Sequence, residues 1–144
     1  MQQPLAIGLI AVGGGVAIAL QSLFSGTIGK HVGILGAVFL VHLEGLALAG
    51  LLLLLRGGGM AGWRTIPWYA LLAGFIGVAI VACVSYAVPR LGLGNTLVIT
   101  IASQLIVGAL LAHFGLLGAV PRPLDPARAV GIAVLILGAW LVVR

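Results

Sequence analysis

The feature that most constrains the fold is an apolar run from Val32 to Leu55 whose one charged residue is Glu44. As a helix this run would be about 36 Å long, because each residue adds about 1.5 Å, and about 20 apolar residues are enough to cross a bilayer. A carboxylate at the centre of a bilayer costs about 2.5–3.5 kcal/mol on insertion scales, and it usually faces a cavity or a partner helix. The run therefore predicts a membrane helix in which Glu44 binds a proton or a cation.

The composition of the whole chain agrees with a membrane protein. The 144 residues are 62% hydrophobic and 6% charged, whereas about 25% of the residues of a soluble domain are charged. The net charge of +5 comes from basic residues that stand singly between apolar runs, which is typical of the flanks of membrane helices. Without a basic patch, we expect no nucleic-acid partner. The lone Cys83 and the absence of clustered ligand residues predict neither a metal site nor a cofactor.

The apolar segments predict an all-α integral membrane protein. We expect a single transmembrane domain over residues 1–144, with five transmembrane helices at about 4–24, 32–55, 68–88, 95–114 and 127–143. Residues 25–31 are predicted to be a connection, and Pro89 to end the third helix. Asp125 followed by Pro126 predicts an N-cap with proline in the first turn.

The predicted helix at 95–114 is the most polar one. Thr100 and Ser103 share a face, and Gln104 lies beside it. Hydroxyl groups can bond back to carbonyls of their own helix. The amide of Gln104 has more hydrogen bonds to satisfy, so we expect it either to bind a neighbouring helix or to line a substrate cavity. His42 and Glu44 are two residues apart and point to different sides of their helix, so a polar partner for Glu44 must come from another helix or another copy.

Five spans would place the chain termini on opposite sides of the membrane. The basic residues on one side are then Arg56, Arg64, Arg122 and Arg128, and those on the other are Lys30, Arg90 and Arg144. This slight excess favours an N-terminus on the inside, but weakly. Near-balanced charges are typical of a chain that inserts in both orientations. We therefore expect an antiparallel homodimer, which would reproduce with two chains the inverted repeat of many transporters.

Two stretches resemble a known family. Residues Ala102-Ser103-Gln104-Leu105-Ile106, followed by Gly108 and Leu110-Leu111, and the closing Gly138-Ala139-Trp140-Leu141-Val142 resemble the small YdcZ-type inner-membrane exporters of the drug/metabolite transporter superfamily. The resemblance implies a bacterial inner-membrane protein, one half of a ten-helix transporter fold, and dual topology. It also implies that Ser103 and Gln104 lie in a cavity or interface. Family members often carry an acidic residue near the end of the fourth helix, where this chain has Ala112 before His113-Phe114-Gly115, and Glu44 matches no family motif.

These observations predict a secondary-active exporter of a small drug-like or metabolite compound, amphipathic or cationic, in exchange for protons. The expected site residues are Glu44, Gln104, Ser103, Thr100 and His42, with Glu44 binding proton and substrate alternately. Two alternatives remain open. One is a flippase for a lipid-linked carrier, with Lys30 and Arg90 at the cavity mouth; the other is a non-transporting accessory membrane protein. The chain offers no nucleophile with a base and no paired carboxylates, so we expect no enzyme.

Overall fold

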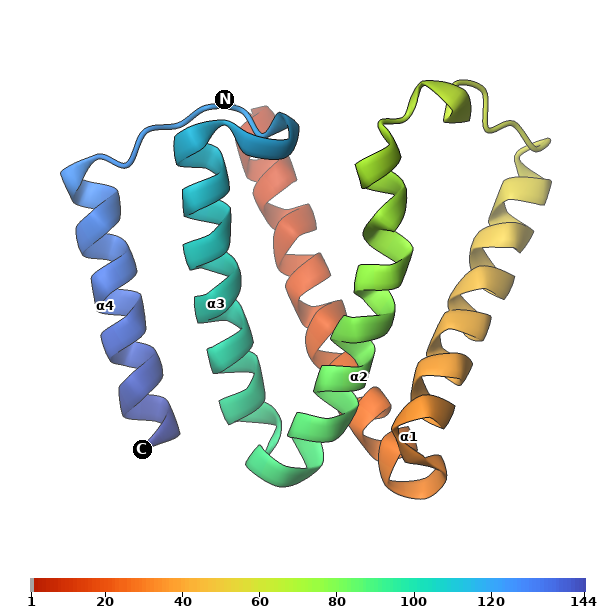
Figure 1. The fold of residues 1–144 in the computed structure, drawn as a ribbon, viewed down its shortest axis with the longest axis horizontal. Coiled ribbons are helices and arrows are strands. Elements are labelled where there is room, and N and C mark those ends of the chain that lie inside the picture. Colours follow the sequence, from red (N-terminus) through yellow and green to blue (C-terminus); the bar gives the residue numbers. More distant parts are fainter. Residues whose placement is uncertain (1) are drawn as a thin grey trace. The chain divides into compact units, whose positions relative to one another are not determined.

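The computed structural model describes the backbone of residues 2–144 and the side chains from residue 5 onward. Over this part of the chain all regular structure is helical, which confirms the predicted class (Figure 1). Four of the helices are long and apolar enough to cross a membrane. The elements in chain order are α1 (Gln2–Leu55), 3₁₀ turns at Trp63–Thr65 and Trp68–Leu72, α2 (Ala73–Leu91), α3 (Leu93–Phe114), a 3₁₀ turn at Leu116–Gly118, and α4 (Pro126–Val143).

Helix α1 contains both of the first two predicted spans. It is 54 residues long, and inside it Gly33 alone has non-helical backbone angles, φ 79° and ψ 168°. The predicted connection at 25–31 is therefore wrong, because these residues are helical and the break comes at residue 33. The physical reason is conformational: the stretch 25–31 contains no proline, whereas Gly33 adopts backbone angles that are essentially restricted to glycine.

Contacts divide the chain into two compact units, residues 1–91 and 92–144. In the first unit, α1 reverses its direction at the Gly33 break, and α2 packs against it (Figure 1). In the second unit, α3 and α4 pack against each other. The small interior of the chain contains the buried apolar residues Ala37, Val38, Val81 and Val88, all in the first unit.

Small residues bring α1 and α2 into close contact before the break. Ser22 and Ser25 of α1 and Ser85 of α2 are buried. A Cβ atom built on Gly26 would lie 2.7 Å from Cγ1 of Val88, and one built on Gly29 would lie 3.2 Å from Cβ of Ser85. Gly26 has no room for a larger side chain, and Gly29 is closely packed, so these glycines set how closely the helices approach, as in small-residue packing between membrane helices.

The remaining helix boundaries lie near the predicted ones. Helix α2 begins later than predicted because Trp68–Leu72 form a 3₁₀ turn, and it continues through Pro89 to Leu91. Pro89 therefore does not end the helix. It lies in the last turn, where its missing N–H costs a single backbone hydrogen bond. The predicted N-cap at Asp125 is confirmed, because its Oδ1 accepts a hydrogen bond of 2.8 Å from the backbone N–H of Arg128.

Candidate functional site: a cavity between α3 and α4

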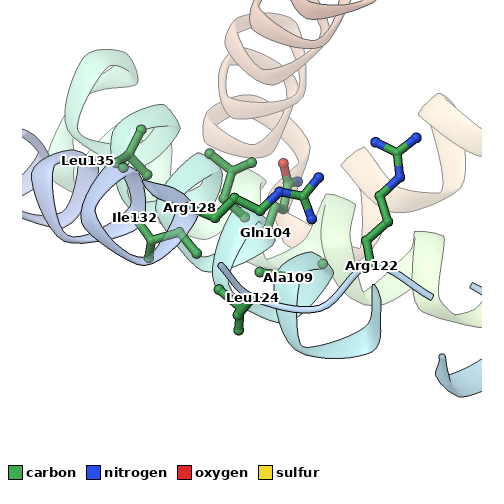
Figure 2. A pocket seen from close by; sticks show the side chains of 10 residues that line it. Gln104, Ala109, Arg122, Leu124, Arg128, Ile132 and Leu135 are labelled. Atoms are coloured by element: carbon green, nitrogen blue, oxygen red, sulfur yellow. The ribbon is translucent and has the colours of Figure 1, made fainter. Parts of the chain in front are cut away.

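A cavity of about 380 Å³ lies between α3 and α4 in the second unit (Figure 2). Its walls combine one amide and two guanidinium groups with apolar side chains. The lining residues are Gln104, Leu105, Gly108 and Ala109 of α3, Arg122 and Leu124 of the connecting loop, and Arg128, Gly131, Ile132 and Leu135 of α4. A largely apolar cavity with a few convergent polar groups is the usual form of a small-molecule site.

Two glycines keep this cavity open. Gly108 lies one helical turn after Gln104 on α3, and Gly131 lines the cavity from α4. A Cβ atom built on either glycine would meet no atom within 4 Å. The space beside them is therefore empty within the unit, and larger side chains at these positions would project into it.

The loop between α3 and α4 folds back onto the end of α3. The backbone N–H of Arg122 donates to the carbonyl of Ala112 at 2.8 Å. The backbone N–H of Leu124 donates to Nδ1 of His113 at 2.9 Å. Because Nδ1 accepts, the proton of the neutral His113 ring lies on Nε2. These bonds fix the positions of Arg122 and Leu124 in the cavity wall, so His113 acts here as a structural residue.

The polar groups of the cavity favour a ligand with hydrogen-bond acceptors. Gln104, Arg122 and Arg128 supply the amide and the two guanidinium groups of this wall (Figure 2). The residues that line the cavity include no carboxylate. Guanidinium groups donate in a planar fork that suits carboxylate and phosphate oxygens, and the apolar wall suits a hydrophobic portion of the same molecule.

The three polar residues predicted on α3 have different roles in the structure. Gln104 lines the cavity. The hydroxyl of Thr100 donates to the carbonyl of Thr96 at 2.7 Å, and that of Ser103 to the carbonyl of Ile99 at 2.8 Å. Ser103 also lines a second cavity of about 470 Å³, together with Trp140 and Arg144. Ser103 and Gln104 therefore belong to different cavities of the α3–α4 unit.

The other two predicted residues lie in the part of α1 that follows the break. Glu44 is exposed, and none of the described side chains forms a hydrogen bond with its carboxylate. His42 is half-buried and faces α2: its Nδ1 lies 2.8 Å from the carbonyl of Val38, and its Nε2 lies 3.4 Å from a Cβ atom built on Gly77. His42 and Glu44 therefore face different surroundings, as their spacing indicates.

Sequence reasoning did not identify Arg122 and Arg128 as cavity residues. Both were interpreted as basic flanks of membrane helices. The proline-containing loop itself could have indicated their position. A connection of about ten residues joins two adjacent antiparallel helices, so its side chains stay close to the ends of both helices. His113 followed by this loop was a second signal, since a ring nitrogen at a helix C-terminus can accept from a returning backbone.

The family model for YdcZ, described as "Putative inner membrane exporter", matches residues 6–141 of the chain. No curated protein and no solved structure matches it. The match covers both units, the α3–α4 cavity, and the four apolar helices of a multi-pass membrane protein. The chain therefore belongs to the YdcZ family of inner-membrane exporters.

Proposed function

We propose that this chain is a secondary-active exporter of a small drug-like or metabolite compound, coupled to protons. Each chain would be one half of a ten-helix transporter. In this arrangement α1 crosses the membrane twice, on either side of Gly33, and thereby supplies the fifth span. Two copies in opposite orientations would enclose the substrate path at their interface.

The observation that carries this proposal is the exposure of Glu44. The carboxylate follows the break by eleven residues, which places it about 16 Å along the helix and near the middle of an apolar span. Exposure to lipid at that depth would cost about 2.5–3.5 kcal/mol on insertion scales. A second copy that covers Glu44 with polar groups or water would remove this cost. Glu44 would then lie in the substrate path at the interface of the two copies.

Coupling would follow from competition at Glu44. A carboxylate can bind a proton or a polar group of the substrate, but not both at once, so release of one accompanies binding of the other. Gln104 would form part of the substrate wall in the α3–α4 cavity. The hydroxyls of Thr100 and Ser103 would contribute less, because each already donates to its own helix.

Transport by vesicles containing the purified chain tests this assignment. The probes are two fluorescent compounds, an aromatic cation and an aromatic carboxylate, followed under an imposed pH gradient. Whichever of the two probes the original chain transports uphill, we expect Glu44→Gln to abolish that transport, because the residue can no longer exchange a proton. The matched control is Asp125→Asn, which removes the other acidic residue of the chain but keeps an N-cap. Uphill transport at the full rate by Glu44→Gln would contradict the role of Glu44.

A flippase for a lipid-linked carrier is the second candidate. The observation that favours it is the pair of arginines, Arg122 and Arg128, in a largely apolar cavity, since guanidinium groups suit a phosphate and the apolar wall suits a polyprenyl chain. A polyprenyl phosphate in the vesicles distinguishes the two functions. Its movement between leaflets, without uphill transport of either fluorescent probe, would favour the flippase.

A further inference from the structure

A second polar site lies in the first unit, at the break in α1. A cavity of about 490 Å³ opens there, and its wall includes Lys30, Gly33 and Ile34 of α1 and Ser85, Pro89 and Arg90 of α2. None of these residues belongs to the α3–α4 cavity. Because the wall contains two cations and no carboxylate, the charge of the site is positive.

Ser85 carries unused hydrogen-bonding capacity in this wall. Its side chain is 2% exposed, and its Oγ is the buried side-chain polar atom without a hydrogen-bond partner among the described residues. A buried polar atom without a hydrogen-bond partner destabilises a fold, so an unused hydroxyl in a cavity wall indicates that a bound ligand supplies the missing hydrogen bond.

The backbone of α1 contributes donors at the same place. Gly33 interrupts the helix, so the segment that begins at Ile34 starts with N–H groups that have no carbonyl one turn before them. A helix N-terminus carries partial positive charge and binds oxyanions. Lys30 lies less than one turn before the break, on the preceding segment.

Arg90 is held in a defined orientation at the end of α2. Its Nη1 donates to the carbonyl of Tyr86 at 2.8 Å, and its guanidinium carbon lies 3.7 Å from the centroid of the Tyr86 ring. A guanidinium group restrained in this way keeps its remaining N–H donors available and loses little side-chain entropy on binding. No described residue forms an ion pair with Lys30 or Arg90, and the wall of this cavity contains no carboxylate.

We propose that the cavity at the α1 break binds a phosphate-type oxyanion. Lys30 and Arg90 supply its charge partners, the Ser85 hydroxyl donates to one oxygen, and the backbone N–H groups after Gly33 bind another. The same chemistry fits the phosphate of an anionic lipid headgroup and a free phosphate. The site is independent of the proposed transport at Glu44, and either assignment can fail without the other.

The test measures binding to the full chain in two arms. In the first arm the chain is purified in a neutral detergent, and inorganic phosphate is titrated by calorimetry. In the second arm the chain is placed in nanodiscs of phosphatidylcholine with a minor share of phosphatidylglycerol, and lipid that remains bound after extraction is counted by native mass spectrometry. Binding of phosphate without retention of phosphatidylglycerol assigns a free anion, and selective retention of phosphatidylglycerol assigns a headgroup.

The expected result is that Lys30→Gln with Arg90→Gln weakens binding about tenfold or more, because two charge-assisted contacts are lost. The matched control is Arg56→Gln with Arg144→Gln, which removes the same net charge outside this cavity. Ser85→Ala should weaken binding about threefold to tenfold. The melting temperature of this variant without ligand should stay unchanged or rise, because the substitution removes a buried hydroxyl that has no partner. Equal losses in the two double variants, or no binding in either arm, would overturn the proposal.

Discussion

At the scale of single residues, Gly33 has the largest structural effect. Its φ of 79° and ψ of 168° are strained for any residue with a side chain. We expect Gly33→Ala to lower the free energy of unfolding by about 1–3 kcal/mol, measured by titration with a denaturing detergent in mixed micelles. The matched control is Gly45→Ala, since Gly45 is helical and a Cβ atom there would meet nothing within 4 Å. A Gly33→Ala variant as stable as this control would show that the break is not needed.

Single residues also show what the sequence could predict about the candidate site. For Gln104 the sequence left two roles open, contact with a neighbouring helix or the wall of a substrate cavity, because an amide inside an apolar helix must find partners. The hydrogen-bond acceptors of the Thr100 and Ser103 hydroxyls could not be predicted, since a hydroxyl can donate to a carbonyl of its own helix or to a neighbouring helix equally well. Arg122 and Arg128 were missed because their position depends on how the loop folds back. Two hydrogen bonds hold the loop in that position, from the backbone N–H of Arg122 to the carbonyl of Ala112 and from the backbone N–H of Leu124 to Nδ1 of His113.

At the scale of helices, the α1–α2 contact depends on the small size of Gly26. A Cβ atom there would lie 2.7 Å from Cγ1 and 2.8 Å from Cβ of Val88. Val88 is β-branched and cannot easily rotate away, so the helices must separate. We expect Gly26→Ala to cost about 1–3 kcal/mol by overpacking, measured in the same detergent titration.

A second substitution makes this prediction specific to the contact. Val88→Ala in the Gly26→Ala background should recover part of the loss, because it removes the atoms that clash. Gly13→Ala is the matched control on α1, where a Cβ atom would meet nothing within 4 Å. Additive losses in the double variant would mean that Gly26 and Val88 are not coupled.

The helices themselves were largely predictable, and their junctions were not. The ranges 95–114 and 127–143 lie within two residues of α3 and α4, because strongly apolar segments with an N-cap and an αL glycine define their own ends. The connection at 25–31 was misplaced because its polar residues indicate a loop locally. In the structure Ser25, Gly26 and Gly29 pack against α2, and packing over distant residues decides the conformation there.

At the scale of the whole molecule, the near-balanced basic residues predict insertion in both orientations. The test uses single cysteines at position 2 or 144 in a Cys83→Ala background, labelled from outside with a membrane-impermeant thiol reagent. We expect each cysteine to be labelled in a fraction of the molecules close to one half. Lysines added at 57–59 should shift the population to one orientation, by the positive-inside rule. Labelling of one terminus alone in the original chain would rule out dual topology.

The small interior has a consequence for how the protein behaves at low abundance. In each of the four apolar helices, the chain's own atoms bury at most 17% of the residues in the 18-residue apolar stretch that could cross a membrane. In the proposed antiparallel dimer, pairing obeys mass action in the plane of the membrane, so the paired fraction falls when lipid is added. Transport per chain should decrease as vesicles are made with less protein per lipid. A tandem fusion of two copies should resist this dilution, because its partner is always at the same effective concentration.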